Sequence, residues 1–340
     1  MPRLTETRWQ TGAAAPDAAE FVGAILPRVS RTFALTIPLL RQPLRDHIGL
    51  SYVLCRIVDT VEDHPGLDRE ARDRKFDFLL DRINETSPSH GAWDRFLASW
   101  PPHPNPDYET LMQNAALVME QRFRLAAPVR DAVDECIRHM ILGMRPFPSA
   151  GKAAHPVEAC ADLDRLEEYC HAAAGTVGIL LSHLFQVHLD GNWLTRERVE
   201  QGRRFGLGLQ LTNVIKDHTA DGERGVSYLP SMWLENGLAG APLTREGLRV
   251  AAERTLEHLD EAEAYILAIP PDSQDLRLFC LWAQHLAMGT LRAVAEGRGK
   301  LDRNEVVQIT VTAQGAVTDN SKLERLHREY REAVCSALRD

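Results

Sequence analysis

The sequence predicts an all-α protein, and two observations carry this prediction. Apolar residues recur at the spacing of an α-helix along most of the 340-residue chain. Helix-breaking residues separate the periodic segments, at Pro65–Gly66, Pro101–Pro106, Pro146–Pro148, Gly191 and Pro270–Pro271. The helices expected between these breaks cover residues 17–28, 31–40, 43–63, 68–85, 107–125, 127–143, 163–188, 195–218, 244–267, 273–297 and 320–338.

The segment from Glu305 to Ala313 is the exception to the helical pattern. Its sequence, EVVQITVTA, is rich in β-branched residues, which favour extended structure. We therefore expect a short strand or a loop there. Because no repeat or low-complexity linker divides the chain, we expect a single domain over residues 1–340, with a core at about 17–300 and a C-terminal extension at 301–340.

The composition is ordinary for a soluble globular protein, with 44% apolar and 26% charged residues. The net charge of −9 argues against a nucleic-acid partner, because phosphates require a basic surface. An anionic ligand must therefore be held by local Arg and Lys residues or by bound cations. The six cysteines include no CxxC pair and no metal-binding spacing, which indicates a reducing cytoplasm.

Nothing in the sequence predicts a membrane span. The N-terminal region has no signal-type apolar segment, and no apolar run approaches the roughly 20 residues that a span requires. The last helix, SKLERLHREYREAVCSALRD, is too charged to be expected as an anchor. We expect a cytoplasmic protein that touches membranes at most peripherally, as a monomer or a weak dimer.

The stretch RIVDTVEDH places three carboxylates, Asp59, Glu62 and Asp63, at the end of an apolar helix. Tyr52, Arg56, Asp59 and Asp63 fall at i, i+4, i+7 and i+11, which is one helix face. Asp59 and Asp63 repel each other at this spacing, and a divalent cation would remove the repulsion. Mg²⁺ suits such a site because it binds one or two carboxylates together with phosphate oxygens. A solvated acidic helix end is an equally compatible alternative.

A second polar face occurs in LQLTNVIKDHTADGERGVSYLP. Gln210, Asn213, Asp217 and Asp221 lie at i, i+3, i+7 and i+11 between apolar neighbours. A lone Asn in such a helix is usually a satisfied core amide, but four aligned polar residues are more typical of a polar cavity. Lys216, Arg224 and the Gly222–Gly225 loop offer cations and backbone N–H groups to an anion. Two acidic helix faces could hold Mg²⁺ ions between them and promote the departure of a diphosphate.

Four segments, taken in order, resemble the signature segments of the squalene/phytoene synthase family. They are VSRTFA at Val29–Ala34, YVLCRIVDTVED at Tyr52–Asp63, EYCHAAAGTVG at Glu168–Gly178 and LQLTNVIKDHTAD at Leu209–Asp221. A fifth segment, LFCLWAQHLAMGTL at Leu278–Leu291, is similar to the squalene synthase branch of this family.

The resemblance extends over roughly residues 20–300 and implies a class I isoprenoid synthase, a helical bundle around a central apolar cavity. In the family, two farnesyl diphosphates are joined head to head with the help of about three Mg²⁺ ions, which gives presqualene diphosphate. The squalene branch then reduces this intermediate to squalene with NADPH. We therefore expect a prenyltransferase that makes presqualene diphosphate and continues to squalene.

The resemblance also implies roles for individual residues. Metal ligands are expected at Asp59, Glu62, Asp63, Asn213, Asp217 and Asp221. Contacts with the diphosphate are expected from Ser30, Arg31, Phe33, Arg56, Gln210, Lys216 and Arg224. Catalytic groups are expected at Tyr52, Arg56 and Tyr169, and Tyr169 matches the family's catalytic tyrosine. From the residues alone, Tyr169 could also be a core phenol and Arg31 a surface arginine.

The chain departs from the family pattern mainly by losing cations. The departures are Ala220 in place of Glu, Lys216 and Val226 each in place of Arg, Ala172 in place of an aromatic residue, and VVQIT, with Gln308 and Thr310, in place of a basic segment near the cofactor. The acidic residues are unaffected, whereas the NADPH step is weakened. The formation of presqualene diphosphate is therefore the firmer expectation. We expect NADPH dependence to be weak, with Arg31, Lys300 and Arg303 as substitute cations.

Several alternatives stay open at this point. Presqualene diphosphate could be converted without reduction to dehydrosqualene or hydroxysqualene, the product could be phytoene, or the prenyl group could pass to another acceptor. A binding protein for prenyl diphosphates without catalytic activity is a different class of explanation. Four intact aspartates argue against it, because a binding-only protein has no reason to keep two self-repelling pairs.

Overall fold

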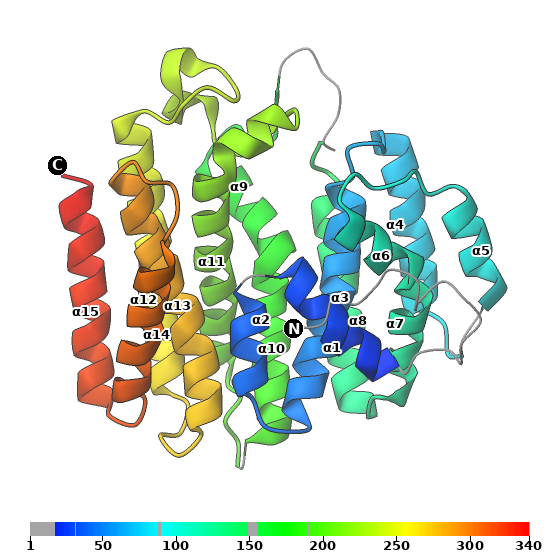
Figure 1. Cartoon of the computed structure of the whole chain (residues 1–340), viewed down its shortest axis with the longest axis horizontal. Helices are drawn as coiled ribbons and strands as arrows, with labels where there is room; N and C mark the ends of the chain where they lie inside the picture. Colours follow the sequence, from blue (N-terminus) through cyan, green and yellow to red (C-terminus); the bar gives the residue numbers. More distant parts are fainter. Residues whose placement is uncertain (1–17, 31, 88–89, 149–155, 190, 340) are drawn as a thin grey trace.

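A computed structural model of the chain describes residues 18–30, 32–87, 90–148, 156–189 and 191–339. Over these residues the structure is almost entirely helical, as the sequence predicts. The longest helices run side by side along the bundle axis (Figure 1). The helices are α1 (Ala18–Val29), α2 (Phe33–Thr36), α3 (Leu44–Glu62), α4 (Arg69–Ile83), α5 (His90–Ala98), α6 (Pro106–Gln113), α7 (Ala115–Gln121), α8 (Ala127–Met144), α9 (Leu163–Cys170), α10 (Thr176–His188), α11 (Arg196–Glu223), α12 (Arg245–Leu267), α13 (Gln274–Ala295), α14 (Arg303–Ala316) and α15 (Asn320–Ala337).

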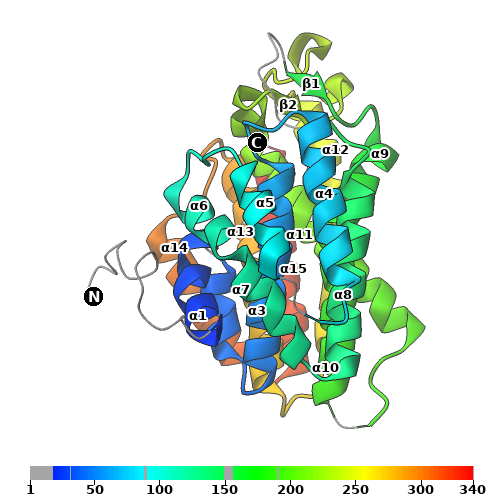
Figure 2. The ribbon, with the colours of Figure 1, turned by 90° about the vertical axis from the view of Figure 1, so that its right-hand side faces the viewer.

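Short elements complete the described structure. The 3₁₀ turns are Ile37–Leu39, Arg122–Arg124, Ser231–Trp233 and Glu235–Gly237. The strands β1 (Val157–Glu158) and β2 (Val226–Ser227) pair in parallel, with Val157 opposite Val226. They lie at one end of the bundle (Figure 2), and the chain that leaves β2 passes over the same end.

Most predicted helices agree with the structure to within a few residues, and three segments differ. The segment expected as one helix over 107–125 is divided at Asn114 into α6 and α7, followed by a 3₁₀ turn. Helix α11 continues five residues beyond the predicted end at 218, to Glu223. Helix α5 was not predicted, although Trp93 and Phe96 are buried at helical spacing.

The prediction of a strand or loop for Glu305–Ala313 is wrong, because this segment lies within α14. Asp302 and Glu305 form a capping box that starts the helix, and within the described residues no strand lies beside it to pair with a β-branched segment. Ile309 and Ala313 are buried four positions apart, which is the spacing of a helix face. In a helix Gln308 and Thr310 point in different directions, so they cannot form one cofactor-facing pair.

Helices α9 and α10 form one apolar stretch at the centre of the bundle. Within the described residues, Leu163–His188 is long and apolar enough to span a membrane by length and composition, contrary to the expectation from sequence. Of its most apolar window 44% is buried, and Ala173, Val177 and Leu181 line an internal pocket. A core helix that faces a cavity passes the same test, so this stretch is weak evidence for a span. A π-turn at His171–Gly175 joins the two helices.

Helices α10 and α11 approach each other closely through glycines. A Cβ atom on Gly178 would lie 1.9 Å from the carbonyl oxygen of Gly202, and one on Gly206 would lie 2.2 Å from the carbonyl oxygen of Ala174. No side chain fits at such distances. The glycines therefore let the backbone of α10, and of the turn before it, pack directly against the backbone of α11.

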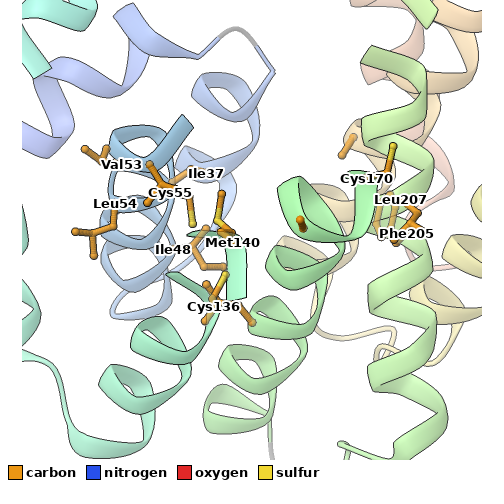
Figure 3. Packing of buried hydrophobic residues seen from close by; sticks show 14 of the residues in the cluster. Ile37, Ile48, Val53, Leu54, Cys55, Cys136, Met140, Cys170, Phe205 and Leu207 are labelled. Atoms are coloured by element: carbon orange, nitrogen blue, oxygen red, sulfur yellow. The ribbon is translucent and has the colours of Figure 1, made fainter. Parts of the chain in front are cut away.

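The apolar core divides around the centre of the bundle. On one side, Cys55 from α3 lies with Cys136 and Met140 from α8 (Figure 3). On the other, Phe205 and Leu207 from α11 lie near the central helix. Helices α3 and α11 therefore stand on opposite sides of the central helix, as Figure 1 also shows.

Candidate active site

A polar pocket of 580 Å³ is lined mainly by residues of α3 and α11, and Arg224 and Tyr228, on either side of β2, also line it. Every described residue that the sequence suggested for the site lines this one pocket. These residues are Ser30, Phe33, Tyr52, Arg56, Asp59, Glu62, Asp63, Tyr169, Gln210, Asn213, Lys216, Asp217, Asp221 and Arg224. Arg31 lies outside the described residues. Spacing along two helices therefore predicted which side chains of α3 and α11 share one space, whereas Ser30, Phe33 and Tyr169 were expected from the resemblance alone.

The α3 wall of the pocket is built around Arg56. Its guanidinium donates to the Tyr52 hydroxyl at 2.9 Å and lies 3.4 Å from Oδ2 of Asp59. The Tyr52 hydroxyl in turn donates to the backbone carbonyl of Val29 at 3.3 Å, which ties α3 to the end of α1. Phe33 packs on the Tyr52 ring with centroids 5.2 Å apart. These contacts fix the α3 face that faces the pocket.

The α11 wall carries a second set of paired charges. Lys216 Nζ lies 2.9 Å from Oδ2 of Asp217 and donates to Oδ1 of Asn213 at 3.2 Å. One turn further on, Asp221 is almost buried, with 8% of its side chain exposed, whereas half of the Asp217 side chain is exposed at 50%. The α11 face therefore offers one accessible carboxylate and one that is enclosed.

Arg224 joins the two walls. It follows the last residue of α11, and its guanidinium contacts Oδ1 of Asp221 at 2.5 Å and Oδ1 of Asp63 at 3.5 Å. Asp63 caps the C-terminal end of α3. Arg224 thus contacts both acidic motifs, the one on α3 that contains Asp59 and Asp63 and the one on α11 that contains Asp217 and Asp221.

Burial shifts the acid–base behaviour of two of these aspartates. It raises the pKa of Asp59 from 3.8 to about 6, with a smaller rise from Asp63, although Arg56 opposes the shift. Burial likewise raises the pKa of Asp221 from 3.8 to about 6, against the pull of Arg224. Both carboxylates are therefore held in a setting that penalises their negative charge, and a cation would relieve this penalty.

Two tyrosines stack at the back of the pocket. The rings of Tyr169 and Tyr228 have centroids 4.2 Å apart, and the Tyr228 hydroxyl donates to Oε1 of Glu62 at 3.0 Å. Burial and the nearby Glu62 charge raise the pKa of Tyr169 well above 10. Burial also raises the pKa of Glu62 well above its usual value. Tyr169 is therefore a neutral phenol at physiological pH, and Glu62, buried and already bonded, suits a metal less well than the aspartates do.

An apolar pocket of 160 Å³ continues inward from the polar one. The two share residues at their junction, including Phe33, Tyr52, Ala173, Gln210 and Asn213. Further in, the lining is formed mainly by the apolar residues Ile37, Ile48, Met140, Val177, Leu180, Leu181, Phe205, Phe279 and Ala283. The arrangement suits a ligand with one strongly anionic end and a long apolar tail.

The departures from the family pattern are placed as follows. Val226 is buried in β2, where it pairs with β1, while Arg224 reaches the pocket from two positions earlier. Ala220 lines the pocket without offering a charge. Ala172 is buried against Gly143 of α8. A Cβ atom placed on Gly143 would lie only 2.6 Å from the Cβ atom of Ala172. An aromatic side chain at position 172 would therefore push α8 away from the segment that joins α9 and α10.

The loop before α14 and the first residue of that helix carry Arg298 and two of the cations expected for NADPH, Lys300 and Arg303, which are both exposed. Arg298 contacts both Glu296 and Glu305, so its charge is already balanced. Gln308 is exposed and donates to Thr312. The Thr310 hydroxyl donates back to the carbonyl of Val306 in its own helix. Gln308 and Thr310 themselves therefore offer no charge to the phosphates of NADPH.

Sequence reasoning missed two tyrosines that line the pocket, Tyr108 and Tyr228. Tyr108 comes from α6 and Tyr228 from the segment after β2. Neither belongs to a periodic polar face, so spacing could not reveal them. The one available signal for Tyr228 was its position just after the second acidic motif.

The acidic residues fit Mg²⁺ by chemistry. Oxygen ligands on two facing helices line a single pocket, which is what a hard cation prefers. As the side chains stand, no three Asp, Glu, His or Cys groups among the described residues lie close enough to hold one ion. The contacts explain this, because Asp59, Asp63, Asp217 and Asp221 are each drawn toward a basic side chain.

Comparison with known families decides the family of the chain. Residues 26–312 match the squalene/phytoene synthase family. The chain belongs to this family. The prediction of family membership, and with it of a prenyltransferase, is therefore confirmed.

Three curated relatives of this squalene/phytoene synthase family member are squalene synthases. The mouse (Mus musculus) protein is 28% identical over 303 residues, covering 85% of this chain and 68% of the relative. Squalene synthase 1 of Arabidopsis thaliana is 28% identical over 291 residues, covering 80% and 64%. The human (Homo sapiens) protein is 26% identical over 330 residues, covering 93% and 73%. The chain thus spans about two thirds of the length of these relatives.

Solved structures show the same fold. The squalene synthase TcSQS in complex with a ligand superposes with a TM-score of 0.72 at 21% identity, covering 94% of this chain and 92% of that one. A dehydrosqualene synthase in complex with a ligand gives a TM-score of 0.57 at 18% identity, covering 88% and 96%. The predicted class I isoprenoid synthase bundle around a central cavity is therefore confirmed.

Proposed function

We propose that this protein joins two prenyl diphosphates head to head to give presqualene diphosphate, in a reaction that depends on Mg²⁺. One observation carries the proposal: a carboxylate-lined polar pocket opens directly into an apolar one. A diphosphate ester of a long isoprenoid has the matching division between an anionic head and an apolar tail. Farnesyl diphosphate is the proposed substrate, in accord with the names of the relatives.

The polar pocket would bind and orient the diphosphate. Asp59 and Asp63 on α3, with Asp217 and Asp221 on α11, would hold the metal ions. Bound there, Mg²⁺ would neutralise the diphosphate and make it a better leaving group. Arg56 is held by Tyr52 at 2.9 Å, so its remaining N–H groups can face a phosphate oxygen.

The apolar pocket would shield the allylic cation left when one diphosphate departs. Its lining is mostly aliphatic and aromatic, so it excludes water that would otherwise quench the cation. Phe33 and Tyr52 lie at the junction of the two pockets. Their rings would lie beside the reacting end of the tail, where π faces stabilise positive charge.

Tyr169 is placed to handle the proton lost when the cyclopropane ring closes. Its raised pKa means that it begins as a neutral phenol and cannot itself be the final base. The released diphosphate is the stronger acceptor, so the hydroxyl would pass the proton on to it. The Tyr228 ring, stacked at 4.2 Å and fixed through Glu62, would hold Tyr169 in position.

Reduction to squalene is the proposed second half-reaction, and the non-reductive products remain the alternative. The alternative is favoured by one observation, namely that Gln308 and Thr310 on α14 carry no charge and form hydrogen bonds within their own helix. Incubation with farnesyl diphosphate and Mg²⁺ without NADPH tests the first half-reaction. Presqualene diphosphate or a hydrocarbon derived from it is expected by mass spectrometry. If the protein is folded and farnesyl diphosphate is recovered unchanged, the proposal is contradicted.

A further inference from the structure

The inference concerns Arg224 and rests on the proposed metal and diphosphate site. Arg224 contacts both acidic motifs, through Asp63 on α3 and Asp221 on α11. Arg56 and Lys216, by contrast, each pair with an aspartate of their own helix. Among the described pocket residues, Arg224 is thus the cation that bridges the two walls.

The position of Arg224 puts it in direct competition with a metal ion. Its guanidinium uses Oδ1 of Asp63 and Oδ1 of Asp221, which are oxygens that a metal would need. Asp221 is enclosed, with 8% of its side chain exposed, so an unpaired charge there would be costly. The guanidinium of an arginine is not deprotonated in proteins, so Arg224 stays charged. A metal ion must therefore displace a permanent cation before it can bind these two carboxylates.

A diphosphate changes this balance. It carries more negative charge than a carboxylate, and it offers paired oxygens to the planar guanidinium fork. Arg224 lines the pocket that would hold the diphosphate, and 43% of its side chain is exposed, so it has room to turn toward the ligand. Once Arg224 has moved to the diphosphate, Asp63 and Asp221 are free for metal ions.

We propose that Arg224 is an internal counter-cation that keeps the two acidic motifs neutralised until a diphosphate arrives. It thereby couples metal binding to diphosphate binding. Metal alone binds weakly because Arg224 occupies the ligands, and metal with diphosphate binds tightly because Arg224 has a better partner. By linkage, the metal must tighten diphosphate binding by the same factor.

The test measures metal affinity directly and does not use catalysis. Mn²⁺, a paramagnetic substitute for Mg²⁺, is titrated into the whole protein with and without inorganic pyrophosphate, and free Mn²⁺ is followed by electron paramagnetic resonance. The variants are Arg224→Met, which keeps the apolar stem, and Arg224→Lys, which keeps a charge without the fork. Arg249→Met is a matched control, because Arg249 is 42% exposed and also pairs with two carboxylates, Glu246 and Glu253, away from the pocket.

Wild-type protein should bind Mn²⁺ about tenfold or more tightly when pyrophosphate is present, within the usual range of coupling between sites. Arg224→Met should bind Mn²⁺ alone about 5–50-fold more tightly than wild type and lose most of the coupling. Arg224→Lys should be intermediate, and Arg249→Met should match wild type. Thermal unfolding in chelator shows whether each variant is folded.

Three results would overturn the inference. One is unchanged or weaker binding of Mn²⁺ alone to a folded Arg224→Met protein with coupling intact. The second is the same outcome for Arg224→Lys, should the Met variant not fold. The third is a loss of pyrophosphate affinity alone, which would make Arg224 a simple diphosphate ligand. If wild-type protein binds no Mn²⁺ even with pyrophosphate, the proposed metal site itself fails.

Discussion

Replacing Asp59 by Asn should stabilise the metal-free protein while abolishing diphosphate release. Burial raises the pKa of this carboxyl from 3.8 to about 6, so its negative charge opposes folding at neutral pH. Because one pKa unit corresponds to about 1.4 kcal/mol, the difference is worth about 3 kcal/mol. The side chain is 26% exposed, and solvent screening reduces this value. We therefore expect a gain of about 1–2 kcal/mol in the free energy of unfolding at pH 7.

The pH dependence follows from the direction of the shift. A carboxyl with a raised pKa in the folded state binds its proton more tightly there than in the unfolded chain. Its contribution to stability is present below pH 3.8 and is lost as the pH rises through about 6. The advantage of Asp59→Asn should therefore be near zero below pH 3.8, grow up to about pH 6, and stay constant above it.

Urea unfolding in the presence of chelator, at several pH values, measures this difference. Asp81→Asn is a suitable control, because Asp81 is exposed on α4, and its unfolding free energy should change by less than about 0.5 kcal/mol. A loss of stability in Asp59→Asn at pH 7 would refute the reasoning, as it would mean that the pair with Arg56 outweighs burial. Turnover of farnesyl diphosphate near the wild-type rate would refute the metal-binding role.

Three further predictions follow from the site and the packing. Tyr169→Phe should lower the rate of presqualene diphosphate formation about 10²–10⁴-fold without loss of stability, and a fall of less than about threefold would make Tyr169 a packing residue. Gly178→Ala should lower the free energy of unfolding, measured with urea, by about 1–3 kcal/mol, because the new Cβ would lie 1.9 Å from the Gly202 carbonyl oxygen. Gly23→Ala is the control, because nothing lies within 4 Å of its Cβ position. Squalene should dominate only when NADPH is abundant, with presqualene diphosphate or a water- or proton-loss product at limiting NADPH; squalene alone at low micromolar NADPH would place the cofactor site away from α14.

The sequence predicted the helices well because most of them bury one face. The spacing of their apolar residues follows the buried face, as in α3 and α12. Helix α14 was misassigned because β-branched residues have strand propensity, but propensity is a weak preference that packing overrides. The face of α14 that packs on α13 and α15 is buried only in the complete bundle. The local sequence does not show which neighbours a segment will have.

The candidate site was predictable to the extent that it lies on two regular helices. Asp59 and Asp217 share a pocket because each belongs to a polar face of fixed period. Tyr228 could not be found in this way, since a two-residue strand pairing carries it to Glu62. The bridge from Arg224 to Asp63 depends on the distance between α3 and α11, which no spacing within one helix can encode.

The π-turn at His171–Gly175 has a consequence for the length of this segment. Tyr169 and Val177 both face the cavity, yet eight positions in an uninterrupted α-helix would place them about 80° apart around the axis. The one extra residue of a π-turn shifts the phase by about 100° and so brings both side chains to the same side. Deleting one of the alanines at 172–174 would leave seven positions between Tyr169 and Val177 in a regular helix, about 20° apart, so the two side chains would stay on the same side. Turning the segment into a regular helix without changing its length would instead rotate Tyr169 by about 100° relative to Val177. The π-turn is therefore what lets a spacing of eight residues bring both side chains to one side of the segment.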